Sequence, residues 1–188
     1  MKRVVLVLLI LVLGSSFAFS FDLLDYPPAL RGGNFLIDLG IGYGGWGSSY
    51  GRLHVPPIVV TGEYCLPVGV PISVGAMFAF SRYEDSYSWL RDYKWTFTYL
   101  TFAGRGNWHW NLPVNGLDLY TGLSLGYQHG IVSYSGPDQD YANYRGSSVS
   151  DLYWGFQAGA HYYFTNNIGV MAEVGYPIYI KAGLALKF

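Results

Sequence analysis

The residues best suited to proton transfer in this sequence are its histidines, His54, His109, His129 and His161. A catalytic histidine needs a nucleophile beside it and an acidic residue to orient its ring. None of the four lies in a recognisable arrangement with a serine or an acidic residue. His54 and His129 are expected near one rim of the fold, where a histidine is usually an ordinary polar residue. The sequence therefore predicts no catalytic site.

Metal binding and nucleic-acid binding are not expected either. The single cysteine, Cys65, cannot form an intramolecular disulfide, and the His, Cys and carboxylate residues lack metal-site spacing. We expect no metal and no cofactor. The formal net charge is −1, and the 11 Lys and Arg residues are scattered. No basic patch for a nucleic acid is visible.

A set of charged residues recurs on the polar side of alternating segments. Charges confined to a narrow space must pair or stay hydrated. If the last two segments turn at Pro177, Glu173 and Lys181 lie opposite each other, which predicts an ion pair. We expect the set to fill the interior of the fold, with a proton or ion path much less favoured: Asp38, Glu63, Arg105, Asp118, Glu173 and Lys181.

The elements that position these side chains are β-strands, because the dominant period from residue 34 onward is two. In the last segment, for example, Ile180, Leu184 and Leu186 alternate with Lys181 and Lys187. The same pattern recurs upstream, although the first half of the fourth segment alternates poorly. Eight strands are predicted, at about 35–43, 57–66, 72–82, 95–110, 118–127, 152–162, 168–176 and 179–188.

The connections between these strands alternate in length. Short links rich in Gly, Pro or Asn fall near 67–71, 111–116 and 165–167, and longer ones near 44–55, 83–94 and 133–150. The last connection, at Pro177, is very short. Pro56 and Pro57 remove ladder donors, so the second strand is predicted to start late or to carry a local break. Short turns at one end and long loops at the other are typical of outer-membrane barrels.

The N-terminus has the order of a secretory signal peptide: Lys2 and Arg3, an apolar run from Val4 to Leu13, then small residues including Ala18 and Ser20. The ten-residue run would rise only about 15 Å as a helix, which is too short to span a bilayer. The predicted organisation is a signal peptide at 1–20, a short N-terminal segment at 21–33, and a barrel domain at 34–188.

The composition indicates which face of the barrel is apolar. Charged residues make up 12% and aromatic residues 19% of the chain, against roughly 25% charged residues in soluble proteins. An eight-stranded bore is filled by side chains, so we expect glycine and paired charges inside and apolar side chains facing lipid. The fold class is therefore an all-β, eight-stranded antiparallel up-and-down transmembrane barrel. The rival is a soluble calycin-like binding barrel with the apolar face inward.

The stretch from Tyr163 to Phe188 resembles the closing two strands of the outer membrane protein β-barrel domain family, which includes the OmpA transmembrane domain and OmpX. The resemblance extends more loosely over residues 34–188. It implies fold and a location in the bacterial outer membrane, since members of the family differ widely in task. The alternating C-terminus resembles the signal that the outer-membrane insertion machinery recognises, carried here by Ala182, Leu184, Leu186 and Phe188.

The favoured hypothesis is a non-enzymatic, monomeric outer-membrane barrel with a structural or surface-interaction role. Its partners would be outer-membrane lipid, the insertion machinery during assembly, and a possible surface ligand. The longest loop is rich in Tyr and Asp, and we expect it to include Tyr134, Asp138, Asp140, Tyr141, Tyr144 and Arg145. The alternative is a narrow pore for small solutes or ions, and a lipid-modifying barrel enzyme is less favoured.

Overall fold

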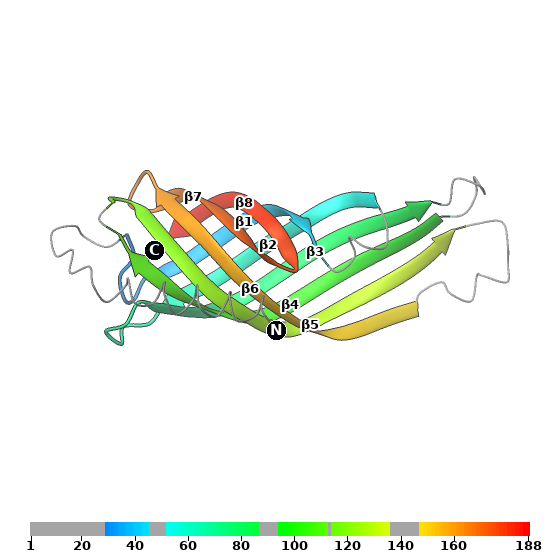
Figure 1. The fold of residues 1–188 in the computed structure, drawn as a ribbon, viewed down its shortest axis with the longest axis horizontal. Helices are drawn as coiled ribbons and strands as arrows, with labels where there is room; N and C mark the ends of the chain where they lie inside the picture. Colours follow the sequence, from blue (N-terminus) through cyan, green and yellow to red (C-terminus); the bar gives the residue numbers. More distant parts are fainter. Residues whose placement is uncertain (1–28, 46–51, 87–93, 113, 136–146) are drawn as a thin grey trace, which may run out of the picture.

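The protein is an eight-stranded antiparallel barrel in a computed structural model, which describes residues 29–45, 52–86, 94–112, 114–135 and 147–188. Each strand pairs with its neighbours in sequence, and β1 pairs with β8 to close the sheet (Figure 1). The predicted fold class is confirmed. The strands are β1 (Phe35–Gly44), β2 (Arg52–Cys65), β3 (Ile72–Ser86), β4 (Lys94–Asn111), β5 (Leu117–Ser135), β6 (Ser147–Tyr163), β7 (Ile168–Tyr176) and β8 (Ile178–Lys187).

Closure occurs between the two strands at the ends of the barrel domain. The Phe35 amide donates to the Phe188 carbonyl and the Phe188 amide to the Phe35 carbonyl, both at 2.9 Å. The end of the barrel that holds these residues and the connections 66–71, 112–116 and 164–167 is called the turn end below. The opposite end is called the loop end.

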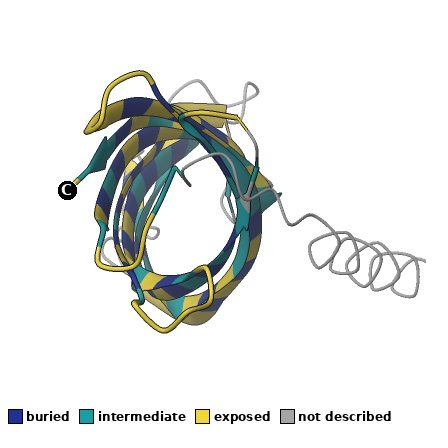
Figure 2. Ribbon diagram, turned by 90° about the vertical axis from the view of Figure 1, so that its left-hand side faces the viewer, coloured by how far each residue is buried: buried dark blue, intermediate teal, exposed yellow. Residues whose placement is uncertain are grey.

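The two faces of the sheet differ as the alternation predicts, and Figure 2 shows buried and exposed residues alternating along the strands. The outward side chains are large and apolar, with Ile41, Leu123 and Leu152 at least 61% exposed. Inward positions hold polar, small or buried residues such as Asp38, Ser73 and Gln157. The calycin-like alternative is therefore wrong, since its apolar side chains would face inward.

Glycine makes room for large side chains inside this narrow bore. A Cβ on Gly159 would lie 2.5 Å from the Tyr120 ring, and one on Gly122 would overlap Asn107 Oδ1. Real Cβ atoms do not approach other atoms so closely, so these two positions need glycine for Tyr120 and Asn107 to cross the lumen.

The wall of the barrel has unequal height. Strands β3 to β6 contain 15 to 19 residues, whereas β1, β7 and β8 contain 9 or 10. At the loop end only Pro177 separates β7 from β8, as predicted. The longer strands therefore continue past this hairpin, and Figure 1 shows β3 to β6 reaching farthest at that end.

Several predicted loop boundaries are wrong because strands continue into them. β5 ends at Ser135 and β6 begins at Ser147, so Tyr134 is a buried strand residue rather than a loop residue. Its ring packs 4.9 Å from that of Trp95 on β4. The part of β3 to β6 that extends beyond the Pro177 hairpin is called the raised wall below. The Trp95–Tyr134 pair packs within it. Asp138, Asp140, Tyr141, Tyr144 and Arg145 lie outside the described residues, as does the predicted signal peptide.

The proline pair breaks the pairing of β2 as predicted, although the strand starts earlier than expected, at Arg52. The register between β2 and β3 shifts between Leu53 and Val55 and again between Val55 and Ile58. Pairing of β2 with β1 begins only at Ile58. Proline has no amide hydrogen for the ladder, so the upper part of β2 pairs with β3 alone.

In the described part of the chain, no helix is both long and apolar enough to span a bilayer.

Closure of the sheet predicts heat-dependent migration on a gel. The purified protein kept unheated in dodecyl sulfate should migrate at a different apparent mass from the boiled protein, because a sealed hydrogen-bonded cylinder unfolds slowly. The same sample boiled beforehand is the control. A single band position under both conditions would contradict a closed barrel.

Candidate functional site

Three buried side chains, Glu63, Arg105 and Lys181, and the largely buried Glu173 form the centre of the lumen. Arg105 on β4 bridges two carboxylates, with Nε 2.8 Å from Glu63 Oε1 and Nη2 2.8 Å from Glu173 Oε2. Lys181 Nζ lies 3.0 Å from Glu173 Oε1, directly across the β7–β8 pair. The ion pair predicted from the hairpin register is thus present, and it belongs to a larger cluster.

Neutral side chains extend this cluster. Tyr120 donates its hydroxyl to Glu173 Oε2 at 2.9 Å, and Glu63 Oε2 accepts from Ser73 Oγ at 2.5 Å and from Asn107 Nδ2 at 2.7 Å. Gln157 in turn donates to Asn107 Oδ1 at 2.8 Å. Buried carboxylates need such donors, because each unsatisfied lone pair in a dry interior is costly.

Two histidines join the remaining carboxylates to the cluster on the side of the turn end. His109 Nδ1 lies 2.9 Å from Asp118 Oδ2, and its Nε2 lies 2.9 Å from Ser73 Oγ. His161 lies between Asp118, at 2.9 Å, and Asp38, at 3.3 Å. The expectation that no histidine lies in an arrangement with a serine or an acidic residue is therefore wrong for the folded chain, because distant residues meet in the lumen. The partners are separated by 9 to 123 residues in sequence.

Both histidine rings lie where a carboxylate can accept a hydrogen from them. Carboxylate oxygens only accept, so the ring nitrogens that face Asp118 and Asp38 are placed to donate. The network contains the carboxylates of Asp38, Glu63, Asp118 and Glu173 beside the cations of Arg105 and Lys181 and the rings of His109 and His161. A partner for each carboxylate is the condition for burying such charges in a narrow bore.

Ser73, His109 and Asp118 have the residue types of a hydrolytic triad, but their surroundings favour a structural role. Ser73 has 0% exposure, so no substrate reaches its hydroxyl in this conformation. Its hydrogen is directed at Glu63 rather than at His109. A carboxylate 2.5 Å from the nucleophile would also repel the negative charge that develops during acyl transfer.

Apolar side chains pack beside the network towards both ends of the barrel. Towards the loop end lies a buried cluster that Ile178 packs against: Val59, Met77, Ala79, Ala103 and Tyr153. Towards the turn end, Tyr163, Met171 and Ala185 pack with Ala29 and Leu30. Lys187 Nζ donates to the Ala29 carbonyl at 2.7 Å, which holds the segment before β1 against the barrel.

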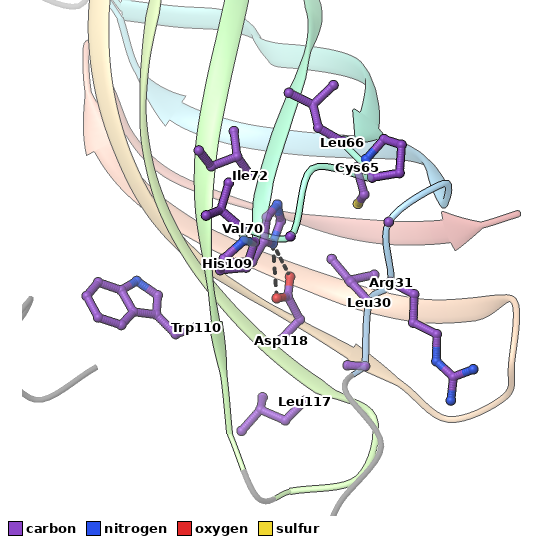
Figure 3. A pocket seen from close by; sticks show the side chains of 15 residues that line it. Leu30, Arg31, Cys65, Leu66, Val70, Ile72, His109, Trp110, Leu117 and Asp118 are labelled. Atoms are coloured by element: carbon purple, nitrogen blue, oxygen red, sulfur yellow. Dashed lines mark hydrogen bonds and ion pairs between the residues drawn. The ribbon is translucent and has the colours of Figure 1, made fainter. Parts of the chain in front are cut away.

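A cavity of about 540 Å³ opens at the turn end (Figure 3). Leu30 and Arg31 line it from the N-terminal segment, and His109, Asp118 and the free thiol of Cys65 line it from the strands. Across the described ranges of the chain, no group of three His, Cys, Asp or Glu residues is placed to hold a metal ion. His109 and Asp118 face each other here, as the dashed lines in Figure 3 mark.

A second cavity, of about 380 Å³, lies at the loop end. Near that end the raised wall carries an exposed charge cluster, in which Lys94 Nζ lies 2.8 Å and His54 Nδ1 3.5 Å from Glu84. The hydrogen bond from Lys94 lowers the pKa of the Glu84 carboxyl below its ordinary value at this exposed rim. His54 thus lies at the predicted rim, whereas His129 lies within β5, where it bonds Ser150 at 2.9 Å.

The structure brings all six predicted charged residues into one network: Asp38, Glu63, Arg105, Asp118, Glu173 and Lys181. Sequence reasoning missed seven further members: Thr61, Ser73, Asn107, His109, Tyr120, Gln157 and His161. The one available signal for them was that each occupies an inward-facing position in the two-residue alternation of its strand. The residues of the predicted insertion signal lie on β8 and directly after it, with Leu184 and Phe188 53% and 62% exposed. Their role as a signal stays a prediction.

No protein-family model and no curated protein matches the sequence. Solved structures do match in fold. A major outer membrane protein from Thermus thermophilus is 14% identical with a TM-score of 0.59, over 82% of this chain and 99% of that chain. Neisserial surface protein A is 13% identical with a TM-score of 0.53, over 82% and 95%. Ail, the attachment invasion locus protein of Yersinia pestis, is 17% identical with a TM-score of 0.49, over 85% and 100%.

The first two matches show that the chain has the fold of small outer-membrane barrels. The exposed apolar belt is the exterior that such a barrel presents to lipid. Together they agree with the predicted location in a bacterial outer membrane.

The buried ion pairs predict that substitutions within them lower the stability of the barrel more than a substitution in an exposed ion pair. Lys181→Met should lower the free energy of unfolding by about 3 kcal/mol, because it removes one of two cations from the buried Glu173 carboxylate. Arg105→Met should cost at least as much, since Glu63 and Glu173 both lose a partner. Urea unfolding in detergent micelles, followed by tryptophan fluorescence, measures both.

Lys94→Met is the matched control, because this lysine pairs with Glu84 at the exposed rim. An exposed pair contributes about 1 kcal/mol or less. Adding Glu173→Gln to Lys181→Met should recover part of the loss. A Lys181→Met protein as stable as the Lys94→Met protein would show that the buried network does not stabilise the barrel.

Proposed function

We propose that the protein is a non-enzymatic, monomeric outer-membrane barrel whose raised wall holds external connections for contacts at the cell surface. In this proposal residues 1–20 are removed on export, and the insertion machinery recognises the C-terminal strand. The observation that carries the proposal is the combination of a filled lumen with four strands that rise beyond the others on one side.

The raised wall suits this role because it is held by its own interactions. Trp95 packs against Tyr134, Arg82 Nε donates to Thr98 Oγ1 at 3.3 Å, and Lys94 pairs with Glu84. A rigid sheet that holds the ends of a connection reduces the entropy lost when that connection binds a partner.

The filled lumen weighs against the pore alternative. The Arg105 cluster crosses the bore, and the apolar cluster around Val59 and Met77 packs beside it towards the loop end. The buried, Glu63-bonded hydroxyl of Ser73 likewise weighs against an enzyme.

The surface-contact role can be tested on the connection between β5 and β6. Replacing residues 136–146 with a short Gly-Ser linker should reduce the adhesion of cells that display the protein to immobilised extracellular-matrix proteins. Adhesion should fall to the level of cells that lack the protein, because the outer surface of the barrel itself faces lipid. Replacement of residues 87–93 between β3 and β4 is the matched control. Adhesion unchanged by the 136–146 replacement would reject the adhesive role of this connection.

The absence of a pore can be tested by planar-bilayer recording. The purified wild-type protein should give no reproducible conductance steps, because paired charges and apolar side chains occupy the bore. An open porin incorporated under the same conditions is the positive control. Repeated steps of uniform size from the wild-type barrel would favour the pore.

A further inference from the structure

The cavity at the loop end has the size and lining of a small-molecule site. Its volume of about 380 Å³ falls within the range of ligand pockets, which is roughly 300–1,000 Å³. Phe97 and Tyr99 of β4 line it, with Gln128 and Gly130 of β5 and Asp151 of β6. On the side of the short hairpin it is bounded by Tyr176, Pro177 and Tyr179.

The unequal wall creates this cavity. Pairing between β6 and β7 ends at Phe156 and Tyr176, so β6 from Ser147 to Gly155 continues beyond its neighbour. The site lies where the tall strands pass the short hairpin, at the end of the barrel where β3 to β6 reach farthest (Figure 1). Tyr176 contributes from the outward side, where its ring lies 5.1 Å from that of Trp154. The site therefore adjoins both the mouth of the barrel and its lipid-facing surface.

The aromatic walls are fixed in place. Gly130 leaves room for the Tyr99 ring, since a Cβ there would lie 3.0 Å from Tyr99 Cε1. Tyr83 packs edge-on against Tyr99 at 6.0 Å and donates its hydroxyl to the Gly44 carbonyl at 2.6 Å. Gln128 Nε2 donates to Thr101 at 3.2 Å. A ligand would thus meet a largely preformed surface, which lowers the entropic cost of binding.

The charge of the site selects the ligand. The lining includes the aromatic residues Phe97, Tyr99 and Tyr179 and the acidic residue Asp151, and no Lys or Arg is among the described lining residues. Aromatic faces carry negative electrostatic potential and attract cations, and a carboxylate adds a full negative charge. An anion would be repelled here, and a neutral molecule would gain nothing from Asp151 beyond hydrogen bonding.

We propose that this cavity binds a compact organic cation, such as a quaternary or alkyl ammonium group, held by the aromatic rings and by Asp151. The inference depends on the geometry of the mouth and not on the role of the external connections. Its failure would therefore leave the proposed function untouched.

The test uses a cation and its uncharged isostere. The full-length mature protein, folded in a nonionic polyoxyethylene detergent, is titrated calorimetrically with choline and with 3,3-dimethylbutan-1-ol, which has the same shape without the charge. Choline should bind at least about fivefold more tightly than the alcohol, which is the scale of a cation–π contribution. Added salt should weaken choline binding only.

Two substitutions locate the site. Asp151→Asn should weaken choline binding by about threefold, the scale of an exposed charge pair, and leave binding of the alcohol unchanged. Tyr99→Leu should weaken choline binding by about tenfold, because it removes an aromatic face. Asp85→Asn is the matched control, since Asp85 lies on the raised part of β3 and does not line the cavity. Heat-dependent gel migration verifies that each variant folds.

Three results would overturn the proposal. The first is equal affinity for choline and the alcohol. The second is an equal effect of Asp151→Asn and Asp85→Asn, which would mean that choline responds only to the general charge of the mouth. The third is tighter binding of a neutral sugar, methyl glucoside, than of choline, which would assign the aromatic lining to saccharide stacking. If Tyr99→Leu does not fold, the Asp151→Asn comparison still decides the question.

Discussion

The backbone hydrogen bonds between β1 and β8 are the constraint on which the rest of the structure depends. Hydrocarbon offers no partner for an amide or a carbonyl, so a sheet can cross a membrane only when its first and last strands pair. Closure of eight strands then fixes a narrow bore that is just wide enough for side chains to fill. Long polar side chains fill this bore, and glycines make room for them where they cross the axis. Tyr120 and Gly159 are an example.

Filling the bore with charge imposes a second condition, which is that each charge has a partner. Each buried carboxylate has a cation or a set of donors within hydrogen-bonding distance, and the two histidines serve Asp38 and Asp118. The network joins residues from all eight strands, so it ties the wall together across the lumen as well as along it. Its role resembles that of the packed apolar core of a soluble domain, with electrostatic partners in place of apolar contacts.

Much of this fold could be predicted from the sequence because alternation with period two determines strand, face and register together. The Glu173–Lys181 pair was predictable because a hairpin centred on Pro177 fixes which residues oppose each other. The contacts of His109 with Ser73 and of His161 with Asp38 were not, since they depend on side chains that cross the lumen. Strand ends were also misplaced. In β5, His129 and Ser133 interrupt the apolar outward face after Tyr127, which hid the continuation of the strand to Tyr134.

The one-residue hairpin at Pro177 also limits how the barrel can sit in a bilayer. Strands of 9 and 10 residues stand beside strands of 15 to 19 residues, so the cylinder is not the same on all sides. A tilted strand of about 9–11 residues is just long enough to cross the hydrocarbon, so β7 and β8 have little length to spare. A bilayer thicker than these two strands would have to thin beside them, whereas the longer strands would span it unchanged.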